Sequence, residues 1–167
     1  MLKVDLHCHS NVSDGVLAPA AVAQTARAAG VDVWALTDHD EVGGIAAARA
    51  AAAEQGMQFV TGVEISITWA NETVHIVGLQ IDESNAALVA GLECTRSGRD
   101  NRGREIAAQL AKAGIPGAYE GALNYVGNPD LMSRTHFARY LVELGVCANI
   151  PDVFKKYLSE GKPGYVP

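Results

Sequence analysis

Residue types that bind metal ions gather in the first half of this 167-residue sequence. Four of its five histidines, His7, His9, His39 and His75, lie before residue 76. His7 and His9 are two residues apart, so on a strand their imidazoles project from one face and Cys8 projects from the other. That geometry favours the two histidines, and not the cysteine, as ligands of one ion. A pair of hydrogen-bonded core histidines is the alternative.

Carboxylates accompany these histidines at the ends of apolar runs. TDHD occupies residues 37–40, Glu64 lies in the apolar stretch GVEI, and Asp14 lies in SDG. A carboxylate is costly to bury unless it is paired or bound to metal. Taken singly, TDHD also fits a helix cap before a solvated loop, and SDG fits an ordinary turn.

A shared functional edge is the simplest explanation, because four predicted strands each deliver a histidine or an acid. Imidazole and carboxylate donors without a thiolate suit Mn, Fe or Zn in a hydrolytic site. Several such ligands sharing ions predict a cluster that clamps a phosphoryl group and activates water at neutral pH.

The elements that must position these residues follow an α/β pattern. The predicted strands are Val4–Cys8, Val31–Thr37, Gln58–Ile67 and Thr73–Leu79, and the predicted helices between them are Pro19–Ala29 and Ile45–Gln55. The first three strands alternate with helices, which indicates parallel pairing. The fourth strand is expected to form a hairpin with the third around Asn71.

The rest of the chain reads as helical. Ala86–Ala113 is expected to be a helix with breaks at Gly98 and Gly103, followed by shorter helices at Gly117–Tyr125, Thr135–Leu144 and Pro151–Leu158. No strand is predicted after Leu79. The sequence therefore divides into a strand-bearing part, residues 1–82, and a helical part, residues 83–167.

Composition excludes several classes of protein. The apolar fraction is 49%, the formal net charge is −6 and the pI is near 5.3, which indicates a folded protein without a large basic nucleic-acid surface. No apolar run reaches the ~18 residues of a membrane span, and the charged N-terminus is unlike a signal peptide. Three widely spaced cysteines form neither a disulfide framework nor a CxxC site, so a reducing cytoplasm is predicted.

Several of these motifs together resemble a known family. DLHCHS at residues 5–10, SDG, TDHD, GVEIS at 62–66 and HIVGL at 75–79 resemble the PHP (polymerase and histidinol phosphatase) family of metal-dependent phosphoesterases. SRTHFARYL at 133–141 and GKPGYV at 161–166 resemble the branch that hydrolyses nucleoside 3′,5′-bisphosphates and trims short RNA from the 5′ end. The resemblance implies a distorted seven-stranded α/β barrel, with residues 83–167 as an inserted helical subdomain.

The resemblance also implies a ligand set and catalytic residues. His7, His9 and a bridging Glu64 would hold one ion, Asp14 and His39 a second, and Glu64 with His75 a third. Asp14, His39 and Glu64 would be catalytic, with two or three ions in a complete site. Mn is the expected metal, with Fe or Zn as alternatives. Asp38 and Asp40 are expected to orient His39.

Substrate-binding residues are expected in the helical part. Arg99 and Arg102 are three positions apart and share a helix face. Arg134, Thr135 and His136 begin a helix whose backbone N–H groups could receive an anion, and Lys162 lies in a Gly/Pro loop. A solvated helix face is the alternative for the arginines. Trp34 and Trp69 are expected to pack in the core or at its rim.

The sequence departs from the family at its C-terminal side. The later His-Pro-Gly and Gly-Ser-Asp-x-His motifs are absent, and about four of seven strands are found. The remaining barrel strands are thus expected to be absent from this chain. A chain ending at Pro167 is expected to bind metal weakly and to need its missing half or another chain for stability.

The expected function is hydrolysis of the 3′-phosphate of nucleoside 3′,5′-bisphosphates, or of short RNA from the 5′ end, with no membrane association. One alternative is a histidinol-phosphate-type phosphatase. The other is a truncated, non-catalytic module that binds anions or a partner.

Overall fold

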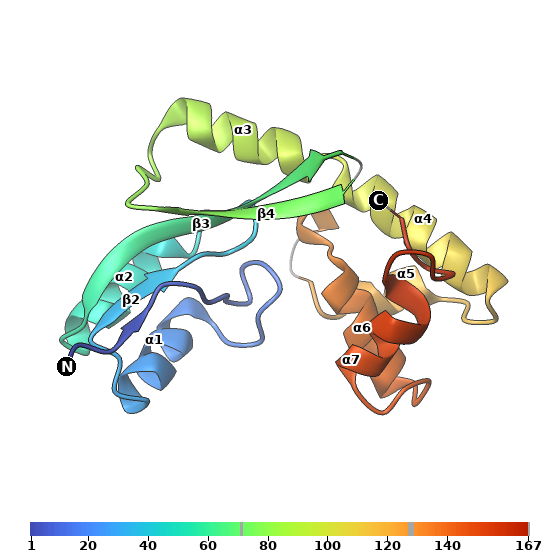
Figure 1. The fold of residues 1–167 in the computed structure, drawn as a ribbon, viewed down its shortest axis with the longest axis horizontal. Coiled ribbons are helices and arrows are strands. Elements are labelled where there is room, and N and C mark those ends of the chain that lie inside the picture. Colours follow the sequence, from blue (N-terminus) through green and yellow to red (C-terminus); the bar gives the residue numbers. More distant parts are fainter. Residues whose placement is uncertain (71, 127–128, 167) are drawn as a thin grey trace. The chain divides into compact units, whose positions relative to one another are not determined.

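The chain folds as two compact units, Met1–Thr95 and Arg96–Pro167 (Figure 1). The computed structural model describes residues 1–70, 72–126 and 129–166. The sequence places the boundary after residue 82, whereas the units divide after Thr95. Helix α3 (Ala86–Arg96) therefore falls almost entirely within the first unit.

The first unit is built on a four-stranded sheet. Its strands are β1 (Val4–Asp5), β2 (Val33–Leu36), β3 (Gln58–Trp69) and β4 (Glu72–Leu79), in the order β1-β2-β3-β4. β1, β2 and β3 are parallel, and β4 is antiparallel to β3. The predicted α/β class and both predicted pairings are confirmed. Asn71, the predicted turn residue, lies outside the described residues.

Two helices connect the parallel strands and cover them. α1 (Pro19–Ala28) begins at a proline and ends before Gly30, whose φ of +82° suits glycine. α2 (Ile45–Glu54) is rich in alanine, so it packs closely against α1 and against β2 and β3 (Figure 1). Trp34 of β2 is fully buried in the core between these layers, as the sequence predicts.

β1 is shorter than predicted, since it ends at Asp5 rather than Cys8. The Asp5 carboxylate accepts a hydrogen bond from the His7 backbone N–H (3.3 Å), which takes that donor away from a strand ladder. The segment still lies beside the end of β2, because the Thr37 N–H donates to the Cys8 carbonyl (2.9 Å). The two histidines are therefore positioned by an irregular segment and not by a strand.

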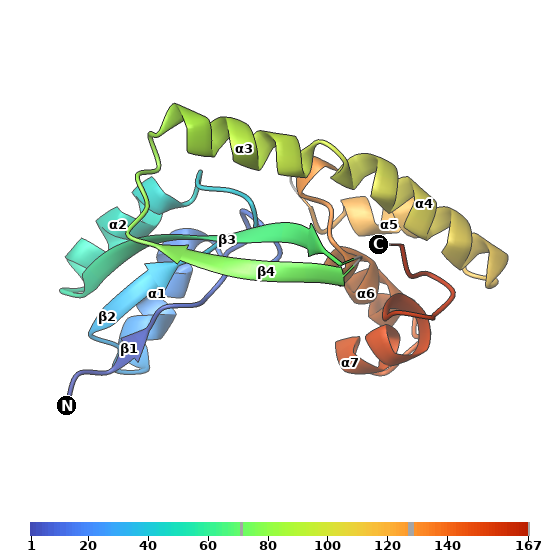
Figure 2. The same cartoon turned by 45° about the horizontal axis from the view of Figure 1, so that its top comes forward.

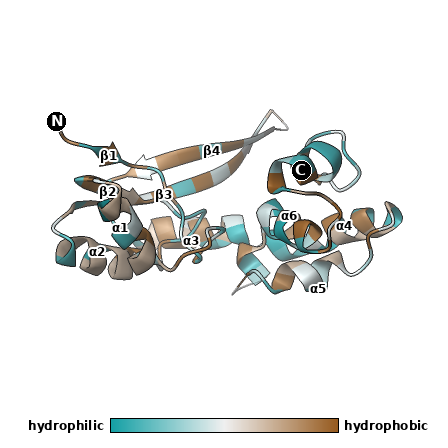
Figure 3. Ribbon diagram, turned by 90° about the horizontal axis from the view of Figure 1, so that it is seen from below, coloured by the Kyte–Doolittle hydropathy of each residue, from teal (hydrophilic) through white to brown (hydrophobic). Residues whose placement is uncertain are grey.

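β3 extends beyond β2 and continues with β4 as a long two-stranded ribbon (Figure 2). β4 has no further neighbour among the described strands. Its apolar side chains are 36–49% exposed at Val74, Ile76, Val77 and Leu79, and the hydrophobic colouring of this strand is visible in Figure 3. Trp69, expected to pack, is instead 72% exposed near the end of the ribbon.

The second unit is helical. It contains α4 (Arg99–Lys112), α5 (Ala118–Leu123), the 3₁₀ turn η1 (Pro129–Leu131), α6 (Arg134–Glu143), and α7 (Ile150–Val153), which continues as the π-helical turn η2 (Phe154–Leu158). These elements enclose one apolar core that includes Leu110, Phe137 and Leu141. No strand follows Leu79 in the described part of the chain, as predicted.

The predicted break at Gly98 is found between α3 and α4, but the predicted break at Gly103 is wrong. α4 runs through Gly103, where a Cβ would lie 3.1 Å from Met132 Cγ. Here glycine permits close packing of the helix and does not end it. No helix of the described residues is long and apolar enough to cross a membrane.

Candidate metal centre

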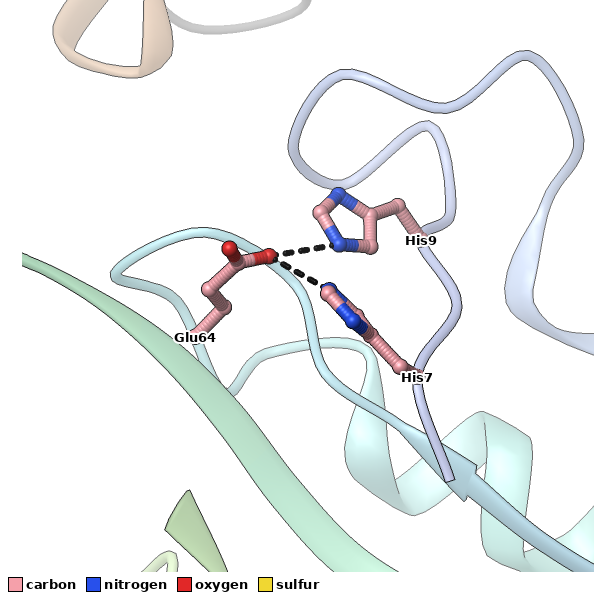
Figure 4. Close-up of side chains that lie close together, drawn as sticks. All are labelled: His7, His9 and Glu64. Atoms are coloured by element: carbon pink, nitrogen blue, oxygen red, sulfur yellow. Dashed lines mark hydrogen bonds and ion pairs between the residues drawn. The ribbon is translucent and has the colours of Figure 1, made fainter. Parts of the chain in front are cut away.

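A buried carboxylate, Glu64, forms the centre of the site. Glu64 lies on β3 where this strand makes an isolated parallel bridge with His39, just past the end of β2. Its Oε2 atom is 2.8 Å from His7 Nε2 and 2.8 Å from His9 Nε2 (Figure 4). Burial raises the pKa of Glu64, but the hydrogen bond from His7 and the surrounding imidazoles outweigh it, so this pKa is lowered.

The HxH segment presents its two imidazoles to the same side, as predicted, and turns Cys8 away. Cys8 Sγ accepts a hydrogen bond from the Trp34 indole Nε1 (2.8 Å) and donates to the Ala35 carbonyl (3.2 Å). Burial raises the pKa of the Cys8 thiol to about 11. A protonated thiol on the opposite side of the segment is not a metal ligand.

Asp14 reaches the cluster from a tightly folded loop. Its Oδ1 lies 2.9 Å from His9 Nδ1. The loop closes with a hydrogen bond from the Gly15 N–H to the Ser10 carbonyl (2.8 Å), and a Cβ at Gly15 would lie 2.5 Å from the His9 carbonyl oxygen. SDG is thus a turn that only glycine can close against the HxH segment. The glycine that makes SDG a turn sequence is also the residue that allows this loop to bring Asp14 to the cluster.

His39 and His75 complete the cluster at longer distances. His39 Nε2 lies 3.7 Å from Glu64 Oε2 and 3.9 Å from Asp14 Oδ2, and His75 Nδ1 lies 3.7 Å from Glu64 Oε1. Burial lowers the pKa of His39 to about 4, so its imidazole is neutral at pH 7. His75 is more exposed than its apolar neighbours suggest, because β4 lies at the edge of the described sheet.

The expectation that Asp38 and Asp40 orient His39 is wrong. The buried Nδ1 atom of His39 has no hydrogen-bond partner in the described structure. Asp38 instead accepts hydrogen bonds from Ser10 and Ser13, and Asp40 accepts one from the Ser66 backbone N–H. Burial raises the pKa of Asp38, although the bonds from the two serines oppose this. Sequence reasoning did not single out these serines, which follow or precede the ligand residues by one or two positions.

The six expected ligand residues form three overlapping groups: His7–His9–Glu64, His9–Asp14–His39 and His39–Glu64–His75. Within each group the donor atoms lie within 4.8 Å of one another. Burial lowers the pKa of His9, but the hydrogen bond with Asp14 and the charges of Asp14 and Glu64 outweigh it and raise this pKa. Imidazoles gathered around ionised carboxylates are the donor set of a divalent-metal centre, so the residues fit more than one such ion.

The expected substrate residues all lie in the second unit, with varied exposure. Arg99 and His136 are buried, Arg102, Arg134 and Thr135 are half-buried, and Lys162 is exposed. The guanidinium of Arg134 lies over the Tyr165 ring (5.3 Å from Cζ to the ring centroid), and His136 Nδ1 accepts a hydrogen bond from the Ser133 N–H (3.0 Å) at the start of α6. Their role in substrate binding stays a prediction.

Sequence comparison finds close relatives of known activity. A 3′,5′-nucleoside bisphosphate phosphatase from Chromobacterium violaceum is 51% identical over 99% of this chain, and a 5′-3′ exoribonuclease from Haemophilus influenzae is 46% identical over 98% of it. The chain spans 58% and 59% of the lengths of these two proteins.

Comparison with solved structures also gives matches over nearly the whole chain. A crystal structure described as an amidohydrolase from Chromobacterium violaceum, with bound sulfate and no metal, matches 99% of this chain and 58% of that one, with a TM-score of 0.96 and 51% identity. A protein from Bifidobacterium adolescentis, assigned as a metal-dependent phosphoesterase, matches the same shares with a TM-score of 0.91 and 30% identity. The PHP domain profile matches residues 5–143, which include all six clustered candidate residues. Because this profile matches most of the chain and includes these residues, the chain belongs to the PHP domain family.

Proposed function

We propose that this chain is part of a metal-dependent phosphoesterase that hydrolyses the 3′-phosphate of nucleoside 3′,5′-bisphosphates and shortens small oligoribonucleotides from the 5′ end. The observation that carries this proposal is the buried Glu64 carboxylate with four imidazoles and Asp14 around it. The named activities of the Chromobacterium violaceum and Haemophilus influenzae relatives support the choice of substrate.

The three overlapping groups support the following proposed roles for these residues. His7, His9 and Glu64 hold one ion, Asp14 and His39 a second, and Glu64 with His75 a third. Such ions, when bound, neutralise phosphoryl charge and lower the pKa of water. Imidazole and carboxylate donors without a thiolate suit Mn, Fe or Zn, and Mn is the metal that we propose. Asp14, His39 and Glu64 are the proposed catalytic residues.

The second unit contains the residues that are proposed to bind the phosphate that is not hydrolysed. Arg99, Arg102 and Arg134 can each make paired, charge-assisted hydrogen bonds with a phosphate. Thr135, His136 and Lys162 complete this proposed set. A second anion site of this kind would let the enzyme recognise the 5′-phosphate while the 3′-phosphate is hydrolysed.

We also propose that the four strands are part of a seven-stranded barrel, with residues 1–82 as its first strands and residues 83–167 as a helical insert. The exposed apolar side chains of β4 and the greater length of the relatives support this arrangement. Further strands, from the remainder of a longer chain or from another chain, would cover that edge. The odd number of widely spaced cysteines favours the cytoplasm as its location.

The test compares two substrates in the longest protein that the gene encodes. Glu64→Gln and His39→Ala are assayed with Mn²⁺ on a nucleoside 3′,5′-bisphosphate and on histidinol phosphate. The unmodified protein should prefer the bisphosphate, and both variants should lose about 10²-fold or more in turnover while keeping their fold. Asp32→Asn is the control. This carboxylate lies at the other end of β2, where it accepts a hydrogen bond from the Lys3 backbone N–H (2.9 Å).

Near-normal rates in both variants would contradict the proposed metal centre. A preference for histidinol phosphate would instead favour the alternative enzyme, and Mn²⁺ binding without turnover on either substrate would favour a non-catalytic module.

A further inference from the structure

The two carboxylates that flank His39 are both buried, and they accept hydrogen bonds from other parts of the chain. Asp38 is 2% exposed and Asp40 is 0% exposed. His39 between them directs Nε2 toward Glu64 and Asp14, and its Nδ1 makes no hydrogen bond with either neighbouring carboxylate. Buried carboxylates need donors, so the donors that they do find indicate what they do.

Asp38 holds the loop that carries Asp14. It accepts three short hydrogen bonds: from Ser10 N (2.7 Å) and Ser13 Oγ (2.6 Å) to Oδ1, and from Ser10 Oγ (2.6 Å) to Oδ2. Both serines are buried, and they precede Asp14 in a segment without regular secondary structure. The position of this loop sets the 2.9 Å contact between Asp14 Oδ1 and His9 Nδ1.

Asp40, on the other side of His39, makes hydrogen bonds with strand β3. Its φ of +51° is in the left-handed region, which is uncommon for residues other than glycine, although aspartate and asparagine tolerate it better than most. Its N–H donates to the Glu64 carbonyl (2.9 Å), and its Oδ1 accepts from Ser66 N (2.7 Å). Ser66 Oγ in turn lies 3.3 Å from His75 Nδ1.

We propose that Asp38 and Asp40 are positioning residues that set the two sides of the cluster separately. Asp38 fixes Asp14 against His9, and Asp40 fixes Ser66 and His75 of the β3–β4 ribbon. Neither carboxylate is a metal ligand. The consequence for metal binding rests on the proposed function, whereas the positioning itself is a property of the metal-free chain.

The first test uses metal-free protein and the ¹⁵N signals of the imidazole rings. Asp38→Ala should shift the His9 signals, because the Asp14 contact is lost, and should leave His75 unchanged. Asp40→Gly, which removes the carboxylate but tolerates the positive φ, should shift His75 and leave His9 unchanged. Asp38→Asn and Asp40→Asn keep an acceptor oxygen and should restore most of each pattern. Asp32→Ala removes a carboxylate that accepts a hydrogen bond from Lys3 N at the far end of β2, so it should change the signals of neither ring.

A milder variant keeps the proposal testable if Asp38→Ala unfolds. Ser13→Ala removes one of the three bonds to Asp38, so it should shift His9 in the same direction by a smaller amount. The proposal is overturned if Asp38→Ala or Ser13→Ala, still folded, leaves His9 unchanged. It is equally overturned if Asp38 and Asp40 variants move the same rings, or if the Asn variants are as damaging as Ala and Gly.

Calorimetric titration with Co²⁺ separates this inference from the proposed function. Asp38→Ala should weaken Co²⁺ binding about 10- to 100-fold, and Asp38→Asn should weaken it much less. If the longest protein that the gene encodes binds no Co²⁺ but the imidazole signals respond as stated, the positioning roles stand and the metal-dependent function fails. If Co²⁺ binds equally well to Asp38→Ala and to the unmodified chain, the positioning role of Asp38 is wrong.

Discussion

In Met1–Thr95 the side chains that converge are polar, and in Arg96–Pro167 they are apolar. The first unit surrounds Glu64 with four imidazoles, while its apolar core consists largely of alanines packed around Trp34. The second unit buries large residues, including Leu110, Phe137 and Leu141, in one continuous core. Of its arginines that are expected to bind substrate, Arg99 and Arg102 lie on α4 and Arg134 lies on α6.

This difference shows which fold features gather chemistry from distant parts of a sequence. Because β1, β2 and β3 are parallel, the segments that follow β1 and β2 reach Glu64 on β3, and the antiparallel β4 adds His75. Residues from positions 7 to 75 therefore meet without any local sequence signal that links them. A helix presents residues three or four positions apart on its own surface and brings nothing else to them. Ligand residues at strand ends are therefore better evidence of a shared site than cations on helices.

The largest expected effect tests whether the two units are independent. Phe137 is fully buried in the core of the second unit, so Phe137→Ala should lower the free energy of unfolding of that unit by about 3–5 kcal/mol. The imidazole signals of His9 and His75 should not change. Leu144→Ala, at a 49% exposed position, should cost about 0.5 kcal/mol or less. Altered imidazole signals in Phe137→Ala would show that the cluster depends on the helical core.

The second test asks whether the helical unit contributes more than a scaffold. Arg99→Ala, Arg102→Ala and Arg134→Ala should each cost roughly 2–4 kcal/mol of transition-state binding, which is about 30- to 1,000-fold in kcat/KM, if their contacts with phosphate are desolvated. The loss should be much smaller with a substrate that lacks the 5′-phosphate. The exposed Lys155, changed to alanine, provides the matched control. Equal losses on both substrates would assign these arginines to structure alone.

The sequence predicted well where the determinant is local or where strand geometry is regular. Helix α6 (Arg134–Glu143) was expected at Thr135–Leu144, and the strand pairing was expected as found. His7 and His9 share a side as predicted, although β1 ends before them, because Thr37 still holds the Cys8 carbonyl and keeps the segment extended.

What the sequence could not predict depends on contacts between distant segments. The donors to Asp38 come from Ser10 and Ser13, more than twenty positions earlier, so no local pattern assigns that carboxylate to the loop. Gly103 resembles a helix break in the sequence, and only the neighbouring Met132 explains it. Trp69 lies at the end of β3, beyond the residues that pair with β2, so its exposure could not be predicted from its own segment.

Metal addition should stabilise one unit only. An ion at 100 times its dissociation constant should add about 2.7 kcal/mol to the stability of the first unit, because it binds the folded cluster and not the unfolded chain. With Mn²⁺, the protected backbone amides of Met1–Thr95 should exchange with solvent up to about 100-fold more slowly, those of Arg96–Pro167 should be unchanged, and a chelator should reverse the effect. Equal slowing in both units would show that they unfold together.

The smallest effect concerns the hydrogen bond between Cys8 Sγ and the Trp34 indole, which connects the HxH segment to the core of the first unit. Cys8→Ala removes the acceptor of the Trp34 indole N–H, and leaving this buried donor unsatisfied should cost about 1–3 kcal/mol of unfolding free energy. Cys8→Ser keeps an acceptor for Trp34 and a donor for the Ala35 carbonyl, so it should cost less. Because Thr37 N and Oγ1 both hold the Cys8 carbonyl (2.9 and 3.2 Å), the backbone of the segment should stay in place in both variants. Denaturant unfolding and Co²⁺ titration measure the two properties separately. A fall in metal affinity with unchanged stability would mean that the thiol acts on the cluster and not on the core.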